Sequence, residues 1–181
     1  MNLNEFKILN EMFKSKRPLF FRELSKKTGV SIGGVQQVLK NYSSFIEKET
    51  KGRNTYYFFK NNLNVFYLFR IIENKKVQFF IEKNSEFKEL FNYFIKNKID
   101  CLIFGSYAKG ISGKKSDLDL LVFSAKKFPE YLCPVKLHVI RLSKLQFESA
   151  FKKKEALIKE ILKNHIIING VDYFSSIMKD E

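Results

Sequence analysis

Two aspartates separated by one residue are the part of this sequence best suited to chemistry. Asp117 and Asp119 follow a polar loop, and ten residues separate Asp117 from the pair Gly105-Ser106. Two carboxylates on one side of a strand repel each other unless a cation lies between them, and Mg²⁺ prefers such hard oxygen ligands. Backbone N–H groups that follow a glycine at the start of a helix favour a phosphate. The two segments together predict a site for a metal-bound triphosphate.

The elements that must position these residues can be predicted from the surrounding pattern. The apolar run IDCLIF, residues 99–104, indicates a strand that is buried on both faces. SYAKG predicts a short helix, ISGKKS a polar loop and DLDLLVF a second strand. Side chains two apart on a strand share a face, so Asp117 and Asp119 should point the same way and the intervening leucine into the core. The lysines in and beside this loop either contact the triphosphate or are simply solvated: Lys109, Lys114 and Lys115.

This segment resembles the nucleotidyltransferase superfamily that includes DNA polymerase β, and is most similar to its minimal branch. The similarity rests on Gly105-Ser106 and Asp117-Leu118-Asp119, and also on Phe104, the triplet 108–110 and Ser116. It spans roughly residues 85 to 170 and implies a mixed-sheet α/β domain over residues 85–181. It also implies that Asp117 and Asp119 are catalytic and hold Mg²⁺. The nucleotide-binding residues it implies are Gly105, Ser106, Lys109 and Ser116.

The reaction that the resemblance implies is transfer of a nucleoside monophosphate from an NTP, with ATP as the expected donor, to a hydroxyl group. The family often supplies a third carboxylate from a later strand. Here that strand is CPVKLHVIRL, and the inward position holds His138 instead. A histidine can act as a base near neutral pH, so His138 is the third catalytic candidate. The alternative is a hydrogen-bonded histidine without a chemical role.

Residues 1–60 predict a separate unit of three short helices followed by a hairpin. In the helix SIGGVQQVLKNY, Ser31 is the expected N-cap and Ile32, Val35, Val38 and Leu39 are the expected inner face. This order resembles the winged helix-turn-helix family, with residues 61–84 as a connecting helix. The resemblance implies double-stranded DNA as a partner. The residues that would contact DNA are Ser31, Gln36, Gln37, Lys40, Asn41, Lys51 and Arg53.

Composition favours a polyanionic partner. The formal net charge is +14, and residues 1–60 hold 12 basic residues against 5 acidic ones. No apolar run is long enough for a membrane span, so we expect no membrane partner. Cys101 and Cys133 are too few for a disulfide framework and lack metal-ligand spacing, which is typical of a reduced, cytoplasmic protein. The N-terminal unit could instead pack against the second domain or form a homodimer.

Two functions remain open. The first is a Mg²⁺-dependent nucleotidyltransferase localised by its DNA-binding unit. The second is a DNA-binding transcriptional regulator, antitoxin-like, whose nucleotidyltransferase domain binds nucleotide without turnover. The resemblance implies that minimal nucleotidyltransferases often pair with a separately encoded helical partner, as in toxin–antitoxin modules. The intact Gly-Ser and Asp-x-Asp pair favours the enzyme, whereas the missing third carboxylate favours the regulator.

Overall fold

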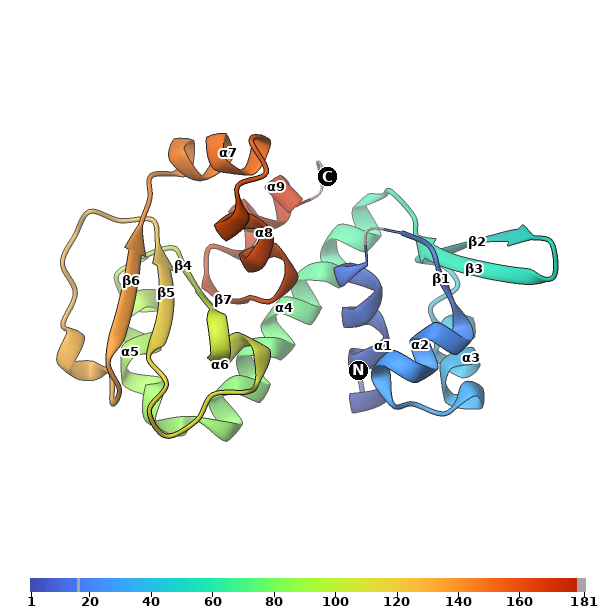
Figure 1. Ribbon diagram of the computed structural model, residues 1–181, viewed down its shortest axis with the longest axis horizontal. Coiled ribbons are helices and arrows are strands. Elements are labelled where there is room, and N and C mark those ends of the chain that lie inside the picture. Colours follow the sequence, from blue (N-terminus) through green and yellow to red (C-terminus); the bar gives the residue numbers. More distant parts are fainter. Residues whose placement is uncertain (16, 179–181) are drawn as a thin grey trace. The chain divides into compact units, whose positions relative to one another are not determined.

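The computed structural model describes residues 1–15 and 17–178 (Figure 1). The chain divides into two compact units, Met1–Ile72 and Glu73–Glu181. One long helix, α4 (Leu63–Lys83), begins in the first unit and ends in the second. Within the described residues, no helix is both long and apolar enough to cross a membrane.

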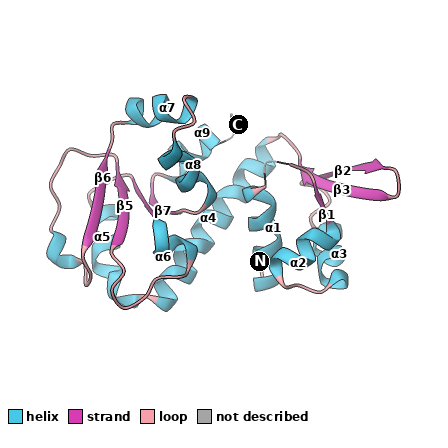
Figure 2. Cartoon of the chain, viewed as in Figure 1, coloured by secondary structure: helices cyan, strands magenta, loops and turns pink. Residues whose placement is uncertain are grey.

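The first unit consists of three helices and a small antiparallel sheet. Its helices are α1 (Leu3–Lys14), α2 (Phe21–Thr28) and α3 (Ile32–Asn41), and its strands are β1 (Leu19–Phe20), β2 (Ile46–Lys51) and β3 (Asn54–Phe59). The sheet order is β1-β3-β2 (Figure 2). The order of three helices and then a hairpin agrees with the sequence pattern. The two-residue strand β1 was not predicted, because two residues carry no detectable alternation.

Local sequence signals explain where these helices begin and end. The Asn2 side chain accepts from the backbone N–H of Glu5, and Glu5 caps the Asn2 N–H in return, which starts α1. Gly29 ends α2 with a φ of +69°, a conformation that glycine adopts without strain. Ser31 then caps α3 by accepting from the N–H of Gly34 at 3.2 Å.

The core of the first unit is formed by one face of each helix together with the inner face of the sheet. Ile8, Leu9 and Leu24 are fully buried, as is Val35 on α3. The expectation that Ile32 belongs to this inner face is wrong, since its side chain is 43% exposed. It is the first residue of α3, and the buried stripe of that helix begins one turn later.

The second unit contains a four-stranded sheet, ordered β6-β5-β4-β7. Its strands are β4 (Cys101–Phe104), β5 (Leu118–Val122), β6 (Leu137–Arg141) and β7 (Ile166–Asn169). Strand β4 is antiparallel to both β5 and β7, whereas β5 and β6 are parallel. The sheet is therefore mixed, as predicted.

Helices cover both faces of this sheet (Figures 1 and 2). The helices after α4 are α5 (Lys88–Lys96), α6 (Gly105–Lys109), α7 (Lys144–Lys152), α8 (Ala156–Lys163) and α9 (Val171–Met178), with short 3₁₀ turns at Ser85–Phe87 and Glu130–Leu132. Ser85 begins the first 3₁₀ turn, and Lys88 begins the α-helix that follows it.

Each face of the sheet has its own hydrophobic core. Leu118 and Leu120 point to one face, where they pack with Phe87 and Phe94. Leu121 points to the opposite face and packs with residues of α7, α8 and α9. Because side chains alternate along a strand, Asp119 lies on the same face as Leu121. The aspartate pair therefore lies on the face that carries the last three helices.

Candidate functional site

The backbone at Gly105 and the carboxylate of Asp119 are in close contact. Strand β4 ends at Phe104, whose Cα pairs directly with that of Asp119 across the antiparallel ladder. The chain then turns at Gly105, which is buried and has a φ of +68°. A β-carbon at this position would lie 2.0 Å from Asp119 Oδ2. Only glycine allows the turn and the carboxylate to occupy this space together.

Strand β6 and the residue immediately before it supply one positively charged or ionisable partner to each aspartate. Asp119 lies directly opposite His138 in the parallel ladder, and Asp119 Oδ1 accepts a hydrogen bond from His138 Nδ1 at 2.8 Å. Asp117 immediately precedes β5, and its Oδ2 lies 3.3 Å from Lys136 Nζ. Lys136 and His138 are two apart, so both aspartates face the same side of the sheet.

The His138 hydrogen bond has a chemical consequence. Because the carboxylate can only accept, the proton lies on Nδ1 and the neutral ring keeps Nε2 as its basic nitrogen. The side chain of His138 is 60% exposed, so Nε2 is accessible to a bound molecule. The structure therefore brings together the three residues that the sequence predicted as catalytic, and it orients the imidazole through Asp119.

The two serines predicted to bind nucleotide have different surroundings. Ser106 is the second residue of α6, and among the described residues its hydroxyl has no hydrogen-bond partner. Ser116 Oγ accepts from the N–H of Gly113 at 2.9 Å and so closes the loop before Asp117. Helix α6 has only five residues, so its dipole is small. The unpaired N–H groups of its first turn remain available to an anion.

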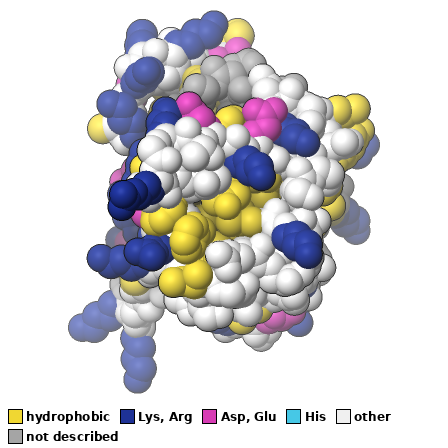
Figure 3. Space-filling model, turned by 90° about the vertical axis from the view of Figure 1, so that its right-hand side faces the viewer, with side chains coloured by type: hydrophobic (Ala, Val, Ile, Leu, Met, Phe, Trp, Pro, Cys, Tyr) yellow, Lys and Arg dark blue, Asp and Glu magenta, His cyan; other side chains and the backbone are white. Residues whose placement is uncertain are grey.

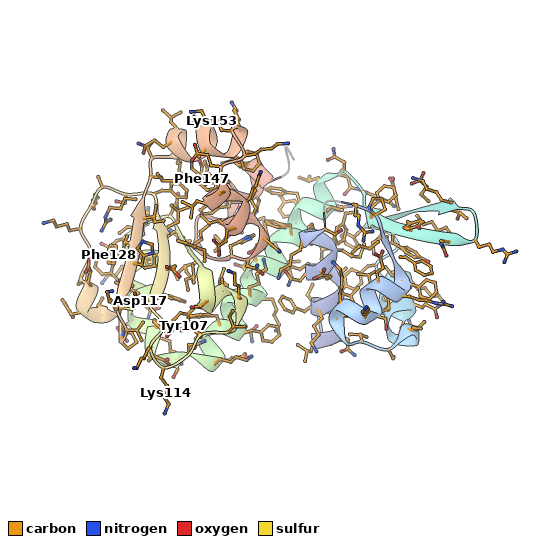
Figure 4. All side chains as sticks on the ribbon, in the orientation of Figure 1. Tyr107, Lys114, Asp117, Phe128, Phe147 and Lys153 are labelled. Atoms are coloured by element: carbon orange, nitrogen blue, oxygen red, sulfur yellow. The ribbon has the colours of Figure 1, made fainter. Side chains whose placement is uncertain are left out.

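The three lysines of the predicted phosphate loop also differ. Lys109 Nζ lies 2.6 Å from Glu160 Oε1 on α8. Lys114 and Lys115 are exposed, and within the described residues neither has an acidic partner. Figure 4 shows Lys114 extending away from the sheet, near the end where Asp117 lies. Glu160 was missed by the sequence analysis, because no local motif marks a residue 51 positions away.

Arg141, the last residue of β6, makes its contacts outside this site. Its guanidinium donates to the carbonyl oxygens of Ser124 and Lys126 at 3.1 and 3.2 Å and lies over the ring of Phe128. It therefore fixes the loop after β5.

The donor chemistry of the aspartate pair fits Mg²⁺. Mg²⁺ is usually held by one or two carboxylates, with water and substrate phosphates as its other ligands. Asp117 and Asp119 supply two such groups, with side chains 40% and 24% exposed. Within residues 1–15 and 17–178, no group of three or more His, Cys, Asp or Glu side chains is arranged to hold a metal. Water and bound phosphate would complete the coordination of Mg²⁺.

The residues predicted to contact DNA lie on α3 and on the β2–β3 hairpin of the first unit. All seven are exposed: Ser31, Gln36, Gln37, Lys40, Asn41, Lys51 and Arg53. Four of them are engaged with neighbours. Ser31 caps α3, Gln37 Nε2 donates to Asn41 Oδ1 at 2.8 Å, and Lys51 Nζ lies 3.2 Å from Glu49 Oε2. Lys and Arg side chains stand out on the face drawn in Figure 3, around a patch of hydrophobic side chains.

A comparison with protein families assigns the second unit. One family model, that of the nucleotidyltransferase domain, matches residues 80–173. This range is just over half of the chain. The chain belongs to this nucleotidyltransferase domain family. Transfer of a nucleoside monophosphate is the general chemistry that the family suggests. Searches of curated proteins and of solved structures returned no match.

Proposed function

We propose that this protein is a Mg²⁺-dependent nucleotidyltransferase that transfers NMP from an NTP, with ATP as the expected donor, to a hydroxyl group. The observation that carries the proposal is the contact between the Gly105 turn and the Asp119 carboxylate. This contact would place a backbone that can bind phosphate beside a carboxylate that can hold a metal ion. A metal-bound triphosphate needs both at once.

Different residues of the site would bind phosphate, hold the metal ion and accept a proton. The N–H groups after Gly105 and the Ser106 hydroxyl would bind phosphate oxygens. Asp117 and Asp119 would hold Mg²⁺, which when bound neutralises phosphate charge and stabilises the attacking and leaving oxygens. The acceptor oxygen would form a bond to the α-phosphorus while the bond to the β-phosphate oxygen breaks and pyrophosphate leaves. His138 Nε2 would take the proton of the acceptor hydroxyl.

We further propose that the first unit is a winged helix-turn-helix that binds double-stranded DNA. The support is the order of its elements and the exposure of the predicted contact residues on α3 and the hairpin. Gln and Asn side chains can contact base edges, whereas Lys40 and Arg53 would neutralise phosphates. DNA binding would then bring the transferase to its place of action.

A second candidate function is a DNA-binding regulator, antitoxin-like, that binds nucleotide without turnover and pairs with a helical, toxin-like protein. One observation favours it. The position opposite Asp119 on β6 holds His138, where the family often has a carboxylate. Nucleotide binding would survive this change, whereas turnover depends on whether His138 can replace the missing group.

Labelling separates the two functions. The protein, Asp117→Ala and His138→Ala would each be incubated with α-labelled ATP, Mg²⁺ and candidate acceptors, including nucleic acid and the protein itself. The enzyme predicts label transfer that is lost in Asp117→Ala and falls about 10²- to 10⁴-fold in His138→Ala. ATP binding without transfer by the unmodified protein would support the regulator.

A further inference from the structure

The ion pair between Lys109 and Glu160 lies at the end of the proposed phosphate loop. Lys109 is the last residue of α6, the single turn that begins at Gly105 beside the Asp119 carboxylate. Glu160 is on α8, and its Oε1 lies 2.6 Å from Lys109 Nζ. The pair therefore links the phosphate loop to a helix that comes 51 residues later in the sequence.

This contact distinguishes Lys109 from the other lysines of the loop. Lys114 and Lys115 have no acidic partner in the described part of the chain, whereas the Lys109 ammonium is already bound to a carboxylate. A phosphate oxygen that reaches Lys109 must therefore replace Glu160 or share the ammonium with it.

The pair is weak enough for a polyanion to displace. The side chains of Lys109 and Glu160 are 35% and 46% exposed, so water screens their attraction. Exposed ion pairs contribute roughly 0.2–1 kcal/mol. A triphosphate, with several charges and further contacts to the Gly105 turn, can overcome such a contact more easily than a monophosphate can.

We propose that Glu160 is a positioning residue that occupies Lys109 in the nucleotide-free protein and weakens the binding of a triphosphate by competing for the Lys109 ammonium. This inference rests on the proposed function, because it requires that the phosphates of a nucleotide bind at the Gly105 turn. Glu160 acts through Lys109 and has no role of its own in the transfer reaction.

The test is a double-mutant cycle on the full chain, with ATP and AMP binding measured by calorimetry in the presence of Mg²⁺. The variants are Glu160→Gln, Lys109→Met and the double variant. The matched control is Glu155→Gln, which removes an exposed carboxylate from the start of the same helix, where it makes no side-chain cap. Thermal melting of each variant reports any loss of folding.

We expect Glu160→Gln to tighten ATP binding about 1.4- to five-fold, which corresponds to the 0.2–1 kcal/mol of an exposed ion pair. AMP, which carries a single phosphate, should gain no more than ATP does. In the Lys109→Met background the gain should vanish, and Glu155→Gln should behave like the unmodified protein. An unchanged ATP affinity in Glu160→Gln, or a gain that persists without Lys109, would overturn this inference. Either result would leave the proposed function intact. If the unmodified protein bound no ATP, the proposed function would fail together with this inference.

Discussion

Asp119 approaches Gly105 so closely that the carboxylate oxygen Oδ2 occupies the space of any side chain at residue 105. The same glycine has a φ of +68°, which other residues adopt only with strain. The turn and the carboxylate thus depend on each other. The site has a conformational requirement that a short Asp-x-Asp motif alone would not have.

Replacing Gly105 should therefore affect both the site and stability. We expect Gly105→Ala to destabilise the protein by roughly 1–3 kcal/mol from backbone strain alone. It should also abolish ATP binding, because the new β-carbon forces Asp119 away. Denaturant unfolding and calorimetry measure the two effects.

The matched control for this variant is Gly113→Ala in the neighbouring loop. A β-carbon at Gly113 would meet no heavy atom within 4 Å. This variant should bind ATP like the unmodified protein. Equal ATP affinity of Gly105→Ala and Gly113→Ala would contradict the assignment of the Gly105 turn.

A buried charged cluster in the second unit predicts how stability depends on pH. Glu73 on α4 is 1% exposed, and its Oε1 lies 2.5 Å from Lys76 Nζ and 3.3 Å from His165 Nε2. Burial alone would raise the pKa of Glu73, but Lys76 and His165 outweigh it and lower the pKa to about 2. The folded protein therefore holds this carboxylate ionised more strongly than the unfolded chain does.

The sign of the effect follows from this shift. Stability from Glu73 is fully present above the unfolded pKa of about 4.5 and is lost as the pH falls toward 2. We expect Glu73→Gln to cost about 3 kcal/mol at pH 7, because it leaves buried Lys76 and His165 without their anion. Urea unfolding between pH 2 and 7 gives the free energy of unfolding of both proteins. The difference between Glu73→Gln and the unmodified protein should become smaller as the pH falls.

The exposed Glu89 of α5 provides the control for this series. Glu89→Gln removes the same group from a solvated position. Its stability should match that of the unmodified protein at every pH. A constant penalty for Glu73→Gln across the whole pH range would refute the electrostatic account of the cluster.

DNA binding by the first unit should depend on salt through Lys40 and Arg53. Each phosphate contact contributes about 0.9 to the slope of log affinity against log salt concentration. We expect Lys40→Ala and Arg53→Ala each to weaken binding to double-stranded DNA and to reduce this slope by about that amount. Lys7→Ala, at an exposed position of α1, should leave the slope unchanged. If the salt dependence of DNA affinity had the same slope in all three variants, the result would favour a packing or dimerisation role for the first unit.

The sequence was most informative where a local pattern determines local structure. The mixed sheet, the short helix after Gly105 and the placement of Asp119 beside it follow from apolar runs, glycine and strand alternation. The position of His138 opposite Asp119 also agrees with the alternation along its strand.

Contacts between distant residues could not be predicted in this way. The Lys109–Glu160 and Glu73–His165 pairs join segments whose spacing is set by helix packing, which no local pattern reports. The exposure of Ile32 has a similar origin, because helical spacing identifies a stripe but not the turn at which burial begins.

The measurement that tests the central claim most directly is calorimetric titration of the full chain and of Asp119→Ala with ATP, in the presence and absence of Mg²⁺. We predict ATP binding that requires Mg²⁺ and is lost in Asp119→Ala, while affinity for double-stranded DNA stays the same. Equal ATP affinity of the two proteins in Mg²⁺ would contradict the claim that Asp119 and the Gly105 turn hold one metal-bound triphosphate.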